Sequence, residues 1–312
     1  MSYHIVNVDA PNCSLSCRDG QLVQRTPDGM ERSVPLEDVA AIIITSFSAT
    51  IHSHLFLEAA KLGVSLIICE SFKPTSLLLP ANRSTDTALS RAVLGLPKRT
   101  VEALWRKTVD AKCRNQLLLA ERIAPESREL DLLRTNVEGR KIHKEAVCAK
   151  LFWQIWGKAI NALPSNFEQT EVPFSRDRDQ PGLNALLNYG YAVLLSTVLQ
   201  KLFGVGLDPT YGIFHVTRER AAPLAYDLME PFRPCVDWRV FQWVQANGTT
   251  EVTKEYRRWV TGFPLEKYEY LELDLEVQGI IEGVVRSFRR ALLQNQVSLY
   301  RPWTPLASKW VG

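Results

Sequence analysis

The 312-residue chain lacks most of the features that would assign it to a specialised class of protein. Its net charge is only +3, so bulk charge alone does not indicate a nucleic-acid-binding protein. Its six cysteines include no paired CxxC arrangement, which argues against the common structural zinc motifs and favours reduced thiols in a cytoplasmic protein. No internal repeat or low-complexity segment is present, and the hydrophobic share of 46% is typical of a globular protein.

Membrane-spanning segments and nucleotide-binding loops are also missing. Residues 180–200 carry no charge, but they contain proline, asparagine, tyrosine, serine and threonine. They are therefore too polar for a lipid-facing span and predict a buried helix, and we expect no membrane association. The run Tyr3–Val8 is followed at once by Asp9 and Pro11, so no signal peptide is expected. No GxxxxGK[ST] loop is present, which argues against a nucleotide pocket.

The sequence pattern changes from strand-like to helical between residues 83 and 97. Before this point, short β-rich runs alternate with turns such as Asp19-Gly20, and after it helical periodicity dominates. The predicted strands are His4–Val8, Cys13–Cys17, Gln21–Arg25, Ser33–Leu36, Val39–Ile44, Val64–Cys69 and Leu77–Leu79. The predicted helices are Ser53–Leu62, Thr100–Glu121, Lys141–Trp156, Asn184–Phe203, Pro223–Glu230 and Leu273–Gln296. We predict an α+β protein with two domains: a β-rich domain at residues 1–82, a linker at 83–97 and an all-α domain at 98–312.

Two carboxylates lie close together in an otherwise apolar helix. Asp227 and Glu230 are three residues apart, so they project from the same helical face as hydrophobic neighbours such as Met229. Two half-buried carboxylates repel each other unless a cation or hydrogen-bond donors compensate. His215, upstream, adds a neutral nitrogen. Two oxygen ligands and one imidazole favour Mg²⁺ or Mn²⁺ over zinc.

A third acid, Glu145, lies in the run Lys144–Trp153, which is typical of an amphipathic helix. Together with His215 and Glu230, it resembles the metal ligands of the CRISPR-associated integrase, the endonuclease-type subunit that inserts new spacers during CRISPR adaptation. Three further runs resemble segments around the metal site of that family: Asn184–Leu194, Gly206–His215 and Asp227–Pro234. The resemblance covers essentially the whole chain.

The resemblance implies a β-rich domain used for homodimerisation and a helical catalytic domain that uses Mg²⁺ or Mn²⁺. It implies double-stranded DNA, a second copy of the chain and a small second adaptation subunit as partners. The implied metal ligands and catalytic residues are Glu145, His215 and Glu230. Asp227 is expected to orient a water or His215, and Asn184 and Tyr191 are expected near the metal.

The residues leave alternatives at these positions. By residue type alone, Glu145 is typical of a surface acid and His215 of a structural histidine. Asn136-Val-Glu138-Gly139 resembles the family motif around Glu145. Only Glu145 is followed by a small pair and then two aromatic residues, as in the family, so we expect Glu138 in a loop.

Asp227 and Glu230 compete for the third ligand position. Glu230 has the longer reach and the Met-Glu-Pro-Phe-Arg context, so it is the predicted ligand. The alternative for Asp227 is a surface acid that pairs with Arg233.

Basic residues cluster near the predicted site and toward the C-terminus. Spaced guanidinium groups suit phosphate binding, although such clusters are as often solvated helix faces. The candidate DNA-contacting residues are Arg218, Arg220, Arg233, Arg239, Arg257, Arg258, Arg286, Arg289 and Arg290.

These observations favour a metal-dependent DNA endonuclease and integrase that inserts foreign-DNA spacers into a CRISPR array. The first alternative is a catalytically inactive DNA-binding scaffold with the same fold. The second alternative is a helical metal phosphohydrolase that acts on small phosphate esters.

Overall fold

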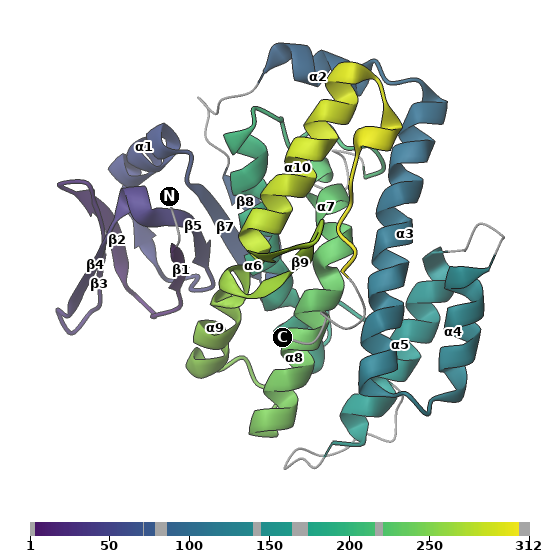
Figure 1. The fold of residues 1–312 in the computed structure, drawn as a ribbon. Coiled ribbons are helices and arrows are strands. Elements are labelled where there is room, and N and C mark those ends of the chain that lie inside the picture. Colours follow the sequence, from purple (N-terminus) through teal and green to yellow (C-terminus); the bar gives the residue numbers. More distant parts are fainter. Residues whose placement is uncertain are drawn as a thin grey trace.

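Strands dominate the N-terminal region of the protein, and helices dominate the C-terminal region (Figure 1). The computed structural model describes residues 4–70, 72–78, 86–139, 145–163, 174–215 and 221–305. The predicted combination of a β-rich N-terminal region with a helical C-terminal region is confirmed at this level.

Two four-stranded sheets form the N-terminal region. The first runs in the order β1 (His4–Val8), β5 (Val39–Ile44), β7 (Ser65–Glu70) and β8 (Lys73–Leu78). The second runs in the order β4 (Glu31–Pro35), β3 (Gln21–Arg25), β2 (Ser14–Arg18) and β6 (Thr50–Ile51). In the first sheet β1, β5 and β7 are parallel, whereas β8 is antiparallel to β7. All six residues of β5 are buried, as expected for an unbroken apolar run in a parallel strand. Helix α1 (Ser53–Leu62) contacts β2.

The helical region is built from helices of very different length. They are α2 (Thr87–Leu94), α3 (Lys98–Ile123), α4 (Arg128–Glu138), α5 (Glu145–Asn161), α6 (Leu183–Gly204), α7 (Pro223–Met229), α8 (Arg233–Asn247), α9 (Lys254–Thr261) and α10 (Val277–Gln294). Four 3₁₀ turns are described along the chain: η1 (Leu36–Asp38), η2 (Glu230–Phe232), η3 (Phe263–Leu265) and η4 (Val297–Leu299).

Helix α6 is the centre of the hydrophobic core. Every residue from Asn184 to Leu199 is buried, because this helix is uncharged around most of its circumference. It contacts helices α7 to α10 and also β5, β7 and β8, so it connects the two regions. The prediction of a buried helix here is confirmed. None of the described helices combines the length and the apolar composition that a membrane span requires.

The helical region is not entirely α-helical, which corrects the prediction. Strands β9 (Lys267–Tyr270) and β10 (Leu273–Glu276) form an antiparallel hairpin. Its turn residues, Leu271 and Glu272, both have positive φ (51° and 67°), as a two-residue hairpin turn requires. The predicted helix from Leu273 therefore began too early, because Leu-Asp-Leu-Glu alternates as a strand does and α10 starts only at Val277.

The segment predicted as a linker also contains a helix. Helix α2 begins after Asp86, whose side chain accepts a hydrogen bond of 2.8 Å from the backbone N–H of Ala88. Its buried residues Leu89 and Val93 join the core, and α2 contacts α10. Helices α4, α8 and α9 were not predicted. Glu138, which we expected in a loop, is the last residue of α4.

The close approach of α6 and α8 depends on Gly190. A Cβ at this position would lie only 2.5 Å from Cγ1 of Val236. We therefore expect Gly190→Ala to lower the free energy of unfolding by about 1–3 kcal/mol through overpacking, measured by urea denaturation. The control is Gly279→Ala in α10, where a Cβ meets nothing within 4 Å and we expect a gain of about 0.5–1 kcal/mol. A Gly190→Ala protein at least as stable as the wild type would contradict the prediction.

Candidate active site

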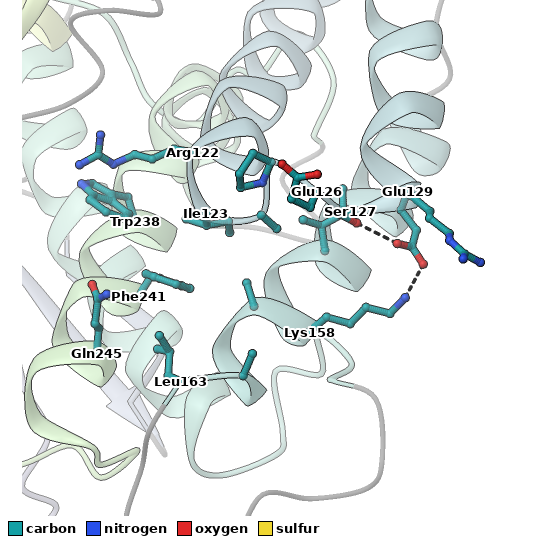
Figure 2. Close-up of a pocket in the computed structure, with 16 residues that line it drawn as sticks. Arg122, Ile123, Glu126, Ser127, Glu129, Lys158, Leu163, Trp238, Phe241 and Gln245 are labelled. Carbon is teal, nitrogen blue, oxygen red and sulfur yellow. Dashed lines mark hydrogen bonds and ion pairs between the residues drawn. The ribbon is translucent and has the colours of Figure 1, made fainter.

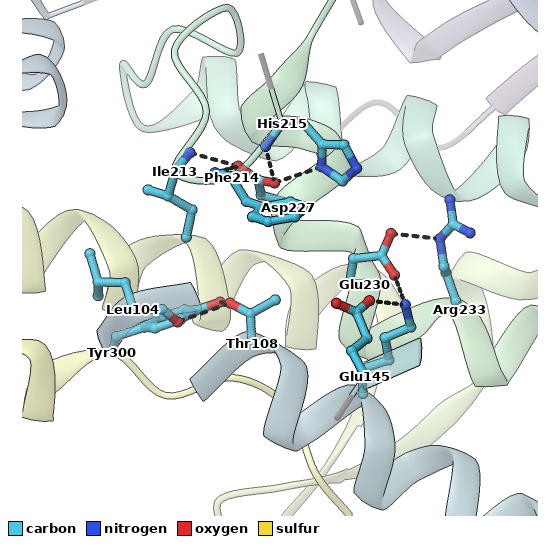
Figure 3. Close-up of polar contacts among 11 residues, drawn as sticks. Leu104, Thr108, Glu145, Ile213, Phe214, His215, Asp227, Glu230, Arg233 and Tyr300 are labelled. Atoms are coloured by element: carbon cyan, nitrogen blue, oxygen red, sulfur yellow. Dashed lines mark hydrogen bonds and ion pairs between the residues drawn. The ribbon is translucent and has the colours of Figure 1, made fainter. Parts of the chain in front are cut away.

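Two of the three predicted ligands meet at a lysine that the sequence did not single out. Glu145 is the first residue of α5, and Glu230 opens the turn η2 between α7 and α8 (Figure 3). Lys112, from α3, places its Nζ 2.7 Å from Oε1 of Glu145 and 2.7 Å from Oε2 of Glu230. The Glu230 side chain is 6% exposed and that of Lys112 is 12% exposed. A single ammonium group is thus shared by two carboxylates in a largely buried position.

The position of Glu230 follows from the residues next to it. Pro231 cannot continue the hydrogen bonds of α7, and the chain tightens into η2 before α8 begins. This turn brings Arg233 Nε to 3.0 Å from Oε1 of Glu230. Burial by itself raises the pKa of Glu230, but the Arg233 and Lys112 cations, with a smaller effect from His215, outweigh it and hold the pKa at about 2. Glu230 is therefore ionised at neutral pH.

His215 is held by Asp227. Asp227 Oδ1 lies 2.7 Å from Nδ1 of His215 and accepts a hydrogen bond of 3.1 Å from the His215 backbone N–H (Figure 3). Oδ2 accepts hydrogen bonds of 2.6 and 3.0 Å from the backbone N–H groups of Ile213 and Phe214. Because a carboxylate can only accept, Nδ1 of His215 donates this hydrogen bond, and the neutral imidazole in this arrangement has its lone pair on Nε2.

Asp227 is not a surface acid. Its side chain is fully buried, and Arg233 pairs with Glu230 instead. The surface alternative for Asp227 is therefore wrong. Gly212 permits the close approach of the loop, since a Cβ there would lie 2.5 Å from the His215 carbonyl oxygen and 2.9 Å from Asp227 Oδ2.

The donor types at this site fit a divalent cation. Two carboxylates and an imidazole with a free Nε2 are suitable ligands for Mg²⁺ or Mn²⁺. Oε2 of Glu230 is buried and lies 2.7 Å from the Lys112 ammonium, so this oxygen already binds a cation. In this structure, however, the Lys112 ammonium lies between the two carboxylates. Among the described residues no three histidine, cysteine or acidic side chains form a ready metal cluster, and the two carboxylates meet at Lys112 instead. The convergence of Glu145, His215 and Glu230 on a metal ion stays a prediction.

A second cation, the partly buried Arg176, lies beside the site and was also missed by the sequence analysis. It donates hydrogen bonds of 2.7 Å to Asn184 Oδ1 and 2.8 Å to Asn188 Oδ1. Its guanidinium carbon is 5.4 Å from the centre of the Tyr191 ring, and that of Arg233 is 4.6 Å away. Burial lowers the pKa of Arg176, whereas Tyr191 and Asp237 act in the opposite direction. Its hydrogen bonds to Asn184 and Asn188 go to neutral amides, and burial raises the pKa of Asp237 to about 7, so the charge of Arg176 is only partly compensated.

Basic side chains surround a small cavity at this point. The cavity has a volume of about 30 Å³ and is lined by Lys73, Pro74, Arg176, Arg178, Asn188, Tyr191, Tyr226, Met229 and Arg233. Lys73 comes from β8, so both regions of the chain contribute. Of its four cationic side chains, Lys73 is paired with Asp179 and Arg233 with Glu230. The cations still outnumber these carboxylates, so we call this the positively charged hollow next to Glu230.

The predicted DNA-contacting residues fall into three groups. Arg218 and Arg220 lie outside the described residues. The guanidinium groups of Arg239, which pairs with Glu266, and Arg257, which pairs with Asp9, are engaged within the fold, so we do not propose them as DNA contacts. The remaining candidates are Arg233, bound to Glu230, Arg286, paired with Glu282 at 2.8 Å, and the solvent-accessible Arg258, Arg289 and Arg290.

A larger cavity of about 990 Å³ lies elsewhere, at the ends of α3 and α5 and beside α8 (Figure 2). Trp238 and Phe241 form part of its wall, and Glu129 and Lys158 pair with each other at its edge. None of the predicted site residues lines it. It is therefore not the candidate active site.

Comparison with known proteins shows which family the sequence of this chain matches. The family described as CRISPR associated protein Cas1 matches residues 6–258. The CRISPR-associated endonuclease Cas1 of Neisseria meningitidis serogroup C is 31% identical over 219 residues, which cover 68% of this chain and 67% of the relative.

Solved structures share the fold at lower sequence identity. A Cas1 protein from Thermotoga maritima aligns with a TM-score of 0.74 at 16% identity, over 93% of this chain and 97% of its own. A casposase bound to an integration product aligns with a TM-score of 0.71 at 20% identity, over 95% of this chain and 91% of its own. A chain of a Cas6-RT-Cas1–Cas2 complex aligns with a TM-score of 0.71 at 17% identity, over 98% of this chain and 37% of its own.

The ionisation of Asp237, a buried acid near Arg233 and Arg176, can be tested through the pH dependence of stability. It accepts a hydrogen bond from the Tyr191 hydroxyl, and burial raises its pKa to about 7, although this hydrogen bond and the Arg233 and Arg176 charges act in the opposite direction. The folded-state pKa of Asp237 is above the unfolded value of about 3.9, so the folded protein binds this proton more tightly than the unfolded chain does. This contribution to the free energy of unfolding is fully present below about pH 4 and is lost as the pH rises to about 7.

We expect the Asp237→Asn protein, which keeps an acceptor for Tyr191, to gain stability relative to the wild type as the pH rises. The difference in free energy of unfolding should grow by up to about 1.4 kcal/mol per pH unit between about pH 4 and 7. Urea denaturation at several pH values measures it. A difference that does not change with pH would show that Asp237 is ionised throughout this range.

Proposed function

The chain belongs to the Cas1 family of CRISPR-associated proteins, and we propose that it is a metal-dependent DNA endonuclease and integrase that inserts foreign-DNA spacers into a CRISPR array. The observation that carries this proposal is the meeting of Glu145 and Glu230, far apart in the sequence, at one cation. His215 is close enough to Glu230 to affect its pKa and is oriented by Asp227. The named activity of the Neisseria relative and the integration product of the casposase support the same conclusion.

We propose that Glu145, Glu230 and Nε2 of His215 hold Mg²⁺ or Mn²⁺. When bound, such an ion lowers the pKa of an attacking hydroxyl or water and neutralises charge on the phosphate. Asp227 keeps the imidazole in the tautomer that exposes Nε2. Arg233 binds the other oxygen of Glu230 and keeps this carboxylate ionised, so the ligand does not have to lose a proton at neutral pH.

The positively charged hollow beside Glu230 is suited to a DNA phosphate. Arg176 and Arg233 approach the same Tyr191 ring, while Arg178 and Lys73 complete the basic wall. Because the amides around Arg176 are neutral acceptors, its charge adds to a positive potential that attracts the backbone of a DNA strand. The hollow has the volume of about one water molecule, so we propose that its basic rim positions a phosphate next to the scissile bond.

The proposed partners follow from the family. A homodimer formed through the N-terminal region and a Cas2-type second subunit would hold a double-stranded fragment during integration. The solved Cas6-RT-Cas1–Cas2 complex, which contains a chain of this fold, supports the second partner.

Substitution of the proposed ligands tests the enzymatic function. We expect Glu145→Ala and His215→Ala each to lower Mg²⁺- or Mn²⁺-dependent cleavage of DNA by about a hundredfold or more, because each removes a ligand of the ion that stabilises the transition state. The matched control is Glu138→Ala, at the exposed end of α4, which should cleave at the wild-type rate. A plasmid-nicking assay and integration of a labelled duplex into a repeat-bearing plasmid measure the effect.

Equal cleavage by the wild type and both ligand variants would remove the proposed active site. The scaffold alternative makes a different prediction, namely unchanged DNA binding in chelator with no cleavage under any metal condition. Hydrolysis of small phosphate esters with no action on DNA would favour the phosphohydrolase alternative.

The basic hollow is tested through DNA affinity. We expect Arg178→Ala to weaken DNA binding for all sequences and to reduce the slope of log affinity against log salt concentration by about one. Fluorescence anisotropy at several salt concentrations measures this slope. Arg18→Ala, which removes an exposed arginine from β2, is the control for general charge loss and should leave the slope unchanged. Equal slopes for the two variants would exclude a phosphate contact at Arg178.

A further inference from the structure

We propose that Lys112 is an internal occupant of the metal site. Its ammonium neutralises Glu145 and Glu230 when the ion is absent, and a divalent cation must displace it in order to bind. This inference rests on the proposed metal-dependent function, because it takes Glu145 and Glu230 to be the ligands. It assigns to Lys112 a positioning role, which sets the affinity of the site for metal.

The first argument is the charge balance of the metal-free protein. The Glu230 side chain is almost fully buried and Glu145 is about two-thirds buried, and both approach the same point. Arg233 contacts only Oε1 of Glu230, so it cannot neutralise Glu145 as well. Without Lys112, the two carboxylates would face each other, and Arg233 would be the one remaining cation for two negative charges. Burial makes such an uncompensated charge costly.

The second argument concerns which oxygens a metal ion can reach. Arg233 Nε already lies 3.0 Å from Oε1 of Glu230, which leaves Oε2 as the oxygen available to an incoming ion. Lys112 Nζ lies 2.7 Å from this same Oε2 and 2.7 Å from Oε1 of Glu145. A Mg²⁺ ion binds carboxylate oxygens at about 2.0–2.1 Å, so the ion and the ammonium cannot share these two oxygens. Binding of the ion and the ion pairs of Lys112 are therefore mutually exclusive.

The third argument concerns the nature of the two lysine contacts. Lys112 Nζ lies 2.7 Å from Oε1 of Glu145 and 2.7 Å from Oε2 of Glu230, so each contact is an ion pair. A divalent ion carries twice the charge of the ammonium and attracts the same two oxygens more strongly. Lys112 thus keeps the carboxylates together without metal, and a divalent ion can replace it.

We test the inference with Lys112→Met, which replaces the unbranched stem of the lysine with one of the same length and removes the charged Nζ. The matched control is Lys107→Met on the same helix, because Lys107 is also partly buried but donates to the backbone carbonyls of Val297 and Tyr300. Mn²⁺ affinity is measured by isothermal titration calorimetry, and the unfolding temperature is measured in chelator and in saturating Mn²⁺. Neither measurement depends on catalytic activity.

For Lys112→Met we expect a lower unfolding temperature in chelator, a larger rise on adding Mn²⁺ and binding of Mn²⁺ about tenfold tighter than in the wild type. Lys107→Met should be destabilised equally with and without Mn²⁺ and should bind Mn²⁺ like the wild type. Equal Mn²⁺ affinity in the wild type and Lys112→Met would overturn the inference and leave the metal site intact. Absence of Mn²⁺ binding in both would overturn the metal-dependent function as well.

A measurement on the wild-type protein keeps the inference testable if Lys112→Met does not fold. The reactivity of each lysine amine toward an acylating reagent is determined by mass spectrometry, in chelator and in saturating Mn²⁺. Displacement from its two carboxylates should raise the reactivity of Lys112 several-fold in Mn²⁺, while Lys107 serves as the internal reference. Unchanged reactivity of Lys112 with Mn²⁺ bound would overturn the inference.

Discussion

The burial of Glu230 next to Glu145 is the constraint on which the arrangement of the site depends. A carboxylate removed from water is stable only where cations or donors replace its hydration. Here the replacements come from two separate elements: Lys112 from α3 and Arg233 from the start of α8. Helix α3 contacts both α5 and η2, so the ion pairs fix three parts of the chain at one point. The packing of these helices and the charge balance of the site therefore depend on each other.

Helix α6, whose one charged residue is Lys201 in its last turn, contributes through a narrow polar stripe. Asn184, Asn188 and Tyr191 are spaced at i, i+4 and i+7, so they share one face of an otherwise apolar helix. The two amides hold Arg176 with neutral acceptors, whereas Tyr191 lies against both guanidinium groups. Amide oxygens fix the position of an arginine without cancelling its charge, whereas a carboxylate would cancel it. The same helix thus forms the core of the fold and maintains a positive potential at the site.

Features encoded locally could be predicted from the sequence, and features created by tertiary contact could not. The runs Val39–Ile44 and Asn184–Phe203 are long and strongly patterned, and the structure has a strand and a helix there. The β9–β10 hairpin was missed because its turn uses Leu271 and Glu272 in place of the usual Asn-Gly or Asp-Gly pair. The ligand candidates were identified from residue type and family spacing. Lys112 and Arg176 carry no such signal. A lysine on an amphipathic helix is normally exposed, and the partners of Lys112 lie far away in sequence. The partners of Arg176 lie on the next helix.

The three ligand candidates are held in place by two different kinds of interaction. Lys112 and Arg233 hold the carboxylates through charge, which requires the cations to stay near them or to be replaced by another cation. His215 is neutral in its proposed role, so no lysine is needed, and Asp227 holds it through hydrogen bonds. Asp227 in turn accepts three backbone N–H groups, which satisfy its buried charge without any ion. The imidazole is therefore positioned independently of metal, whereas the geometry of the carboxylates depends on which cation lies between them.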